Sequence, residues 1–273
     1  MSRWRPERLT MGIDADGIAI CAWREGGWQS AAQLPFDHDL GATAVGLDWV
    51  TALSAAMAQS KVRRGVLNVT LADALARYWL VDVPAGISSL NELHALAAGR
   101  FEALFGEVAS QWHIEADWRA SGRILAAAVP RSLTLALSTC AARAGWKLDS
   151  VVPAAVRTLN RNAARIPDEA WLVVFGHDHY LAILLSGGAP MFVRQLRHEA
   201  GHVAHDLVSR LETECLRGGY AMPVKVVFAG ALPFAVEPDP HSDWQAVVLE
   251  RGLASAAGGN MPGAALAVEG ARA

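Results

Sequence analysis

The sequence predicts an α/β fold made of two related halves, and two observations support that prediction. Predicted strands and helices alternate along the chain, which is typical of α/β proteins. Residues 11–34 and 172–196 also follow one plan, in which an apolar strand, a polar turn, a second strand, a Gly-Gly turn and a third strand succeed one another. A unit that is used twice predicts a duplicated fold with a cleft between its halves. The alternative is that any two β-meanders with Gly-Gly turns resemble one another.

Apolar periodicity gives the order of the elements. Strands are expected at 8–14, 17–24, 28–34, 65–71, 77–83, 109–116, 123–129, 146–152, 170–176, 180–185, 190–196 and 224–229. Helices are expected at 48–61, 89–106, 130–145, 153–165, 201–217 and 243–256. In the first helix, Trp49, Leu53 and Met57 recur at every fourth residue. Ser89 and Glu92 form a capping box at the start of the second.

Composition excludes several classes of protein. The 273 residues suffice for one large or two small domains, and 52% of them are hydrophobic, so the chain can bury a core. The net charge of −3 offers no basic field for nucleic acid or anionic lipid, so no nucleic-acid partner is expected. Cys21, Cys140 and Cys215 lie far apart without a Cys-x-x-Cys pair, which argues against a disulfide framework and favours a reducing compartment.

The mean hydropathy of +0.21 is high for a soluble protein and raises the question of a membrane segment. The best apolar stretch, residues 226–236, is about half of the roughly 20 residues that a span needs, and it contains Gly230 and Pro233. The basic N-terminus is followed by no apolar run, so no signal peptide is expected. The sequence therefore predicts a cytoplasmic protein without a span of its own.

Four stretches, in this order, carry a resemblance to a known family. They are Met11–Asp14, Leu125–Arg161, Leu172–Arg194 and Val226–Pro233. Together they resemble the actin-like proteins of type IV pilus and type II secretion systems, the PilM and GspL families. The resemblance covers nearly the whole chain to about residue 256, and the ordered set carries it rather than any single motif.

The resemblance implies an actin-like, ribonuclease H-like duplicated fold with two domains. Domain I would span residues 1–165, with an inserted subdomain at about 72–125, and domain II would span 166–257. Residues 258–273, rich in glycine and alanine, are expected to form a flexible tail. The second half is expected to be reduced and to lack most of one subdomain, because only a few residues separate the helix at 201–217 from the strand at 224–229.

In the wider actin-like superfamily, two hairpin turns hold the phosphates of ATP and an aspartate positions Mg²⁺. The positions that carry over are Gly12, Asp14, Gly176 and Gly230. The chain departs from the pattern nearby, because Asp16 adds a second negative charge at the first turn and Phe175 stands where active members have an aspartate. We therefore expect a vestigial nucleotide site without catalytic residues or cofactor. ATP binding with Mg²⁺ is the alternative, and strand-end glycines beside a polar turn explain the same residues without any ligand.

The resemblance also implies partners. The expected function is a non-catalytic cytoplasmic scaffold of the inner-membrane assembly platform, a pseudo-ATPase that binds the cytoplasmic N-terminal segment of a single-span inner-membrane protein similar to PilN. The assembly ATPase is a further candidate partner. The expected location is cytoplasmic and peripheral at the inner membrane, through these partners.

One motif points to different chemistry. His198, Glu199 and His202 form an HExxH pattern, and His205 follows three residues later, so the alternative function is a zinc metallopeptidase. On a helix, however, the three histidines would face away from the apolar residues of the same helix, and Gly201 weakens a helix there. We therefore expect no functional metal site.

The tryptophans give the last expectations. Trp49, Trp146 and Trp171 occupy apolar periodic positions and are expected in the core. Trp112 and Trp118 flank a short strand, where they are either core residues or anchors for a partner.

Overall fold

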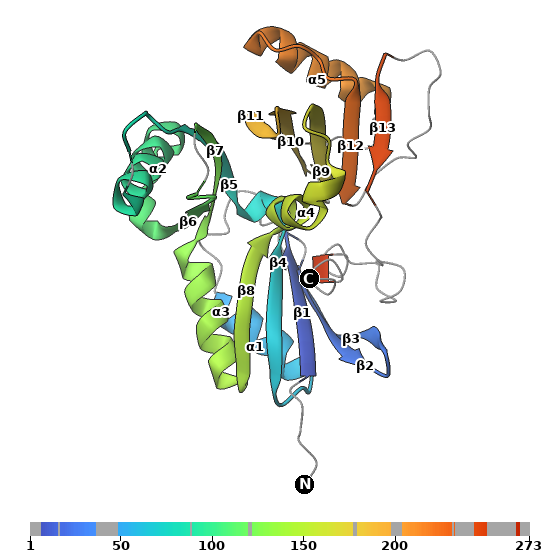
Figure 1. Cartoon of the computed structure of the whole chain (residues 1–273). Helices are drawn as coiled ribbons and strands as arrows, with labels where there is room; N and C mark the ends of the chain where they lie inside the picture. The colour runs from blue at the N-terminus through green and yellow to red at the C-terminus, as the bar shows by residue number, and fades with distance from the viewer. Residues whose placement is uncertain are drawn as a thin grey trace.

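The computed structural model describes residues 7–15, 17–36, 49–87, 89–119, 122–176, 179–197, 204–230, 232, 243–249 and 266–267. Two five-stranded sheets lie one above the other, and helix α4 (Ala154–Asn162) lies between them (Figure 1). A smaller three-stranded sheet stands to one side with helix α2 (Leu90–Phe105). The chain therefore has the layered α/β architecture that its alternating pattern predicts.

The two large sheets have the same topology. In the first, the order is β3-β2-β1-β4-β8, with β1 at Glu7–Asp14, β2 at Gly17–Arg24, β3 at Gly27–Pro35, β4 at Gly65–Leu71 and β8 at Trp146–Pro153. In the second, the order is β11-β10-β9-β12-β13, with β9 at Ala170–Phe175, β10 at His179–Ser186, β11 at Ala189–Arg197, β12 at Lys225–Gly230 and β13 at Gln245–Val248. Each sheet has an antiparallel meander followed by two parallel strands. The predicted duplication is confirmed.

Helices cover these sheets on the faces that the apolar periodicity assigns. Helices α1 (Trp49–Gln59) and α3 (Arg131–Arg143) pack together against the first sheet. Helix α5 (Ala204–Gly218) covers one face of the second sheet, where Trp171, Val173 and Phe175 of β9 join its core. The alternate β9 residues Leu172 and Val174 point to the other face and belong to the core shared with α4. Every residue of β9 is therefore buried.

The inserted unit is a separate small layer. Strands β5 (Arg77–Asp82), β7 (Arg123–Pro130) and β6 (Trp112–Ala116) form an antiparallel sheet that extends past the predicted limit at residue 125. Helix α2 covers one face of this sheet, and Trp79, Phe101 and Trp112 fill the space between them. The capping box of Ser89 and Glu92 is present. The other face of the sheet is turned toward the rest of the protein.

Two expectations need correction. Residues 243–256 were expected to be a helix, but Gln245–Val248 form strand β13, because its β-branched valines pair in parallel with β12 and complete the sheet. Residues 109–111 form a 3₁₀ turn rather than the start of strand β6.

The C-terminal residues also differ from expectation. Leu266 and Ala267, placed in a flexible tail by composition, are buried against the first half, and the Thr10 hydroxyl donates a hydrogen bond to the carbonyl oxygen of Ala267. Burial of these two apolar side chains fixes the position of residues 266–267.

Other predictions are confirmed. Trp49, Trp146 and Trp171 are buried, and Trp112 is a core residue rather than an exposed anchor. Residues 219–224 alone separate α5 from β12, so the second half is reduced at this point. Within the described ranges, no helix is both long enough and apolar enough to cross a membrane.

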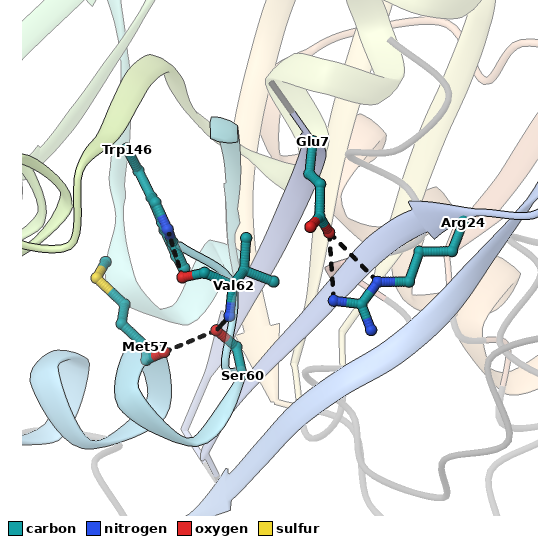
Figure 2. A network of polar contacts seen from close by, with 6 residues as sticks. All are labelled: Glu7, Arg24, Met57, Ser60, Val62 and Trp146. Carbon is teal, nitrogen blue, oxygen red and sulfur yellow. Dashed lines mark hydrogen bonds and ion pairs between the residues drawn. The ribbon is translucent and has the colours of Figure 1, made fainter. Parts of the chain in front are cut away.

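Polar contacts hold the end of the first sheet that lies opposite α4. Figure 2 shows that the indole N–H of Trp146 donates to the carbonyl oxygen of Val62 at 3.2 Å. Ser60 bridges the same loop, because its hydroxyl donates to the Met57 carbonyl at 2.7 Å and accepts from the Val62 amide at 3.3 Å. The loop after α1 is thereby fixed to the start of β8.

Replacing Trp146 with Phe tests this contact. The Trp146→Phe variant leaves the buried Val62 carbonyl without its donor, so the free energy of unfolding should fall by about 1–3 kcal/mol. Urea denaturation measures the loss. The control is Trp23→Phe on the rim of β2, where the tryptophan is 41% exposed and a smaller effect is expected. An equal loss in both variants would contradict a role for the hydrogen bond.

Candidate functional site

The first predicted nucleotide turn lies at the end of β1. Gly12 lies inside the sheet between Ala19 of β2 and Thr70 of β4. Asp14 is 3% exposed, and its carboxylate accepts a hydrogen bond from the amide of Ala15 at 2.7 Å. That amide is therefore engaged within the turn and is not offered to an anion. Asp16 lies outside the described residues.

The second pair of predicted residues lies in the second half. Gly230 of β12 pairs with Phe175 of β9, and a Cβ at Gly230 would lie 2.2 Å from the Phe175 carbonyl oxygen. Close strand packing is therefore enough to require glycine at this position. The amide of Gly176 donates to the carbonyl oxygen of His179 at 2.7 Å, within its own hairpin. Phe175 points into the apolar core beside Tyr180.

The described amides at these turns are not available to a bound nucleotide. A phosphate site needs backbone amides that are free to donate, and the Ala15 and Gly176 amides already donate within the protein. The residue that would replace a catalytic aspartate, Phe175, is an aromatic core residue. We therefore assign no step of any reaction to ATP or Mg²⁺ at these turns.

The HExxH motif lies largely outside the described residues. His198, Glu199 and His202 are among the residues that are not described, and His205 lies in α5 without a described side chain. In the rest of the chain, over the residues that the structure describes, no group of three histidine, cysteine, aspartate or glutamate side chains could hold a metal ion. The metallopeptidase alternative remains a prediction about residues 198–205.

The described cysteines do not offer a reactive nucleophile. Cys21, Cys140 and Cys215 are buried and are not joined in disulfides. Burial raises the pKa of the Cys21 thiol to about 11, and it also raises the pKa of Cys215. Since the thiolate is the nucleophilic form, little of it is present at Cys21 at neutral pH.

A buried aspartate that the sequence did not single out lies where the two halves meet. Asp73 follows β4 in the short helix η2 (Asp73–Leu75), which contacts β10 of the second half. Its carboxylate accepts hydrogen bonds from the Tyr78 hydroxyl and from the Ala155 amide in the first turn of α4, the latter at 3.0 Å. Burial raises the pKa of Asp73 to about 6, the two hydrogen bonds oppose this rise, and the charge of Asp14 adds to it.

An apolar cleft of about 580 Å³ lies between the inserted unit and the second half. One wall is the face of β6 and β7 that is turned away from α2, where Leu125 and Ala127 point inward. The floor is the end of β8 together with Val156 and Leu159 of α4, and the opposite wall is the β10–β11 hairpin. Gly12, Asp14, Gly176 and Gly230 do not line it, so the cleft is separate from the predicted nucleotide turns.

Fixed contacts hold both sides of this cleft. Arg123 of β7 pairs with Asp82 at 2.6 Å and donates to the carbonyl oxygen of Met191 in β11 at 3.2 Å, so it links the inserted unit to the second half. The tip of the β10–β11 hairpin is tied down by Glu169, which accepts from the Gly187 amide at 2.6 Å. The cleft is therefore preformed, as binding sites usually are.

Charged groups gather on one rim. Along β6 the side chains alternate, so Ile114 and Ala116 pack toward α2 while His113 and Glu115 line the cleft, and Asp117 follows on the same side. His113 and Glu115 lie 3.3 Å apart. Over the described part of the chain, neither Glu115 nor Asp117 forms an ion pair with a lysine or an arginine. The rim is therefore acidic.

Solved structures with the same architecture identify the fold. The cytoplasmic domain of EpsL, an inner-membrane component of the type II secretion system of Vibrio cholerae, matches with a TM-score of 0.56 and 14% identity over 98% of this chain and 95% of that one. A Bacteroides thetaiotaomicron protein of unknown function with an actin-like ATPase fold matches with a TM-score of 0.54 and 10% identity, over 83% and 82% of the two chains. The chain has an actin-like fold.

The actin-like fold that the resemblance implied is confirmed. A PilM–PilN type IV pilus biogenesis complex matches with a TM-score of 0.55 and 14% identity, over 83% of this chain and 82% of that one. No protein-family model and no curated protein sequence matches the chain. At these identities the solved structures establish the actin-like fold.

Neither Asp73 nor most of the residues that line the cleft were predicted from the sequence. The position of Asp73 carried a signal, because it lies two residues after β4, a buried strand that runs parallel to β1, and polar residues at such strand ends are often functional. The cleft residues come from four separate segments and carry no motif. Trp118, the second predicted anchor, stacks on His94 with ring centroids 4.2 Å apart and donates its indole N–H to Glu115 at 3.1 Å.

The pH dependence of stability tests the environment of Asp73. Its pKa is higher in the folded state than the ordinary 3.8, so its stabilising contribution is present below about pH 4 and is lost as the pH rises through about 6. This loss should amount to about 3 kcal/mol. Asp73→Asn keeps an oxygen acceptor for Tyr78 and Ala155 without ionising, so its free energy of unfolding should lack this fall.

Urea denaturation across this pH range makes the comparison. The control is Asp149→Asn, at an exposed position of β8, which should keep the pH profile of the unmodified protein. If the Asp73→Asn variant also loses stability between about pH 4 and 6, as the unmodified protein does, the raised pKa of Asp73 is refuted.

Proposed function

We propose that this chain is a non-catalytic scaffold of a type II secretion or type IV pilus inner-membrane platform, whose cleft holds the cytoplasmic segment of a single-span membrane protein. The observation that carries the proposal is the preformed apolar cleft between the inserted unit, α4 and the β10–β11 hairpin. Such a scaffold would be cytoplasmic and would be held at the inner membrane by its partner.

The chemistry of the cleft suits a peptide. Valine, leucine, isoleucine and alanine side chains line its floor and walls, so burial of apolar partner side chains supplies the driving force. Residues Val151–Pro153 of β8 border the cleft, and β8 is the last strand of the first sheet as described. An unpaired sheet edge can add an extended segment through backbone hydrogen bonds.

The fold neighbours support the proposal for the machinery. EpsL is described as an inner-membrane component of a type II secretion system, and PilM was solved in complex with PilN from type IV pilus biogenesis. The shared fold and the chemistry of the cleft support a place in the same kind of assembly. The engaged amides at the two hairpin turns support the non-catalytic part of the proposal.

Filling the cleft tests peptide binding. Ala127 lines the cleft from β7, and Ala127→Trp places an indole ring in the hollow without changing charge. The probes are labelled synthetic peptides that copy the cytoplasmic segments of single-span membrane proteins encoded beside this gene, and fluorescence anisotropy measures their affinity. The unmodified protein should bind one of them, and Ala127→Trp should weaken that affinity at least about tenfold by excluding apolar side chains.

The matched control is Ala55→Trp, at an exposed position of α1. This variant should bind as the unmodified protein does. Failure of the unmodified protein to bind any of the peptides, or equal binding by Ala127→Trp, would overturn the proposed role of the cleft.

The non-catalytic part has its own test. Calorimetric titration with ATP and Mg²⁺ should give no binding heat, because the Ala15 and Gly176 amides are already engaged. Tight binding that is abolished by Asp14→Asn, a variant that keeps the acceptor for Ala15, would instead identify an ATP-binding member of the fold.

A further inference from the structure

The apolar floor of the cleft does not account for the acidic side chains on its rim. His113, Glu115 and Asp117 are exposed, and all three border the cleft along β6. The opposite wall, Gly187–Pro190, carries no charge. On one side, an apolar peptide in the cleft would therefore face a negatively charged and solvent-exposed surface.

Each of the two carboxylates accepts a hydrogen bond that fixes its position but does not neutralise its charge. Glu115 accepts from the indole N–H of Trp118 at 3.1 Å, and Asp117 accepts from the backbone amide of Arg119 at 3.2 Å. These two donors are neutral and do not offset the negative charge of the carboxylates, and His113, 3.3 Å from Glu115, offsets it only when protonated. Arg123, which also lines the cleft, is paired with Asp82, which does not.

We propose that the peptide held in the cleft carries a lysine or arginine beside its apolar residues, and that Glu115 and Asp117 bind this basic side chain. The inference rests on the proposed function and specifies its partner. It agrees with a general property of membrane proteins, because cytoplasmic segments next to a span are enriched in lysine and arginine. The same rim repels anionic lipid headgroups, so it selects a basic peptide and not the membrane surface.

The floor and the rim have different roles in this proposal. Charge complementarity of this kind contributes more to specificity and association rate than to affinity. The apolar floor therefore supplies most of the affinity, and the rim decides which peptides are accepted.

The test uses the same labelled peptides, each made in its natural form and with every lysine and arginine replaced by glutamine. The natural form of the binding peptide should lose about three- to tenfold in affinity against the double variant Glu115→Gln/Asp117→Asn, because exposed ion pairs contribute modestly. The glutamine form should lose a similar factor against the unmodified protein and no further factor against the double variant. Added salt should weaken only the pairing of natural peptide with unmodified protein.

The matched control is Asp206→Asn/Glu212→Gln, which removes the same two kinds of charge at exposed positions of α5. It should bind the natural peptide as the unmodified protein does. If Ala127→Trp abolishes binding while the rim variant and the glutamine peptide bind unchanged, the rim proposal is overturned and the proposed function stands. If no peptide binds the unmodified protein, both fall.

Discussion

The hydrogen bond from the Ala155 amide to the buried Asp73 carboxylate fixes the first turn of α4, and much of the structure depends on where that helix lies. Helix α4 contacts β4 and β8 of the first half and β9 of the second, so it is the layer that both sheets share. A helix of nine residues is too short to be stable alone, and its place is set by what holds its ends. Pro153 starts it and Asp73 satisfies one of its free amides.

The position of α4 then determines the cleft. Val156 and Leu159 project from this helix into the hollow, and the inserted unit and the β10–β11 hairpin close over them from opposite sides. Arg123 spans the two sides through Asp82 and the Met191 carbonyl. A cleft with one floor and two linked walls needs little rearrangement to accept a ligand, which lowers the cost of binding.

The two halves share a strand order but use it differently. In the first half, the chain leaves the sheet after β4 to build a whole sheet and α2 before it returns at α3. In the second half, the equivalent connection, from β12 to β13, spans only residues 231–244. At the strand-end turns, two backbone amides are engaged within the protein, because Ala15 donates to Asp14 and Gly176 donates to His179. In the described structure, the open apolar surface therefore lies in the cleft beside the insertion, while the described amides at the turns are engaged.

Local pattern in the sequence was sufficient for most elements and for the duplication. Alternating apolar residues placed β1 and β2 within one residue of their observed bounds, and Ser89 with Glu92 marked the start of α2, because these signals depend only on neighbouring residues. The sequence missed β13, whose pairing with β12 depends on a partner distant along the chain. It also missed Asp73, whose role requires the fold to bring Tyr78 and Ala155 together. The cleft was decided by tertiary structure alone, since its apolar lining comes from separate segments that share no motif, and only packing around α4 makes them adjacent.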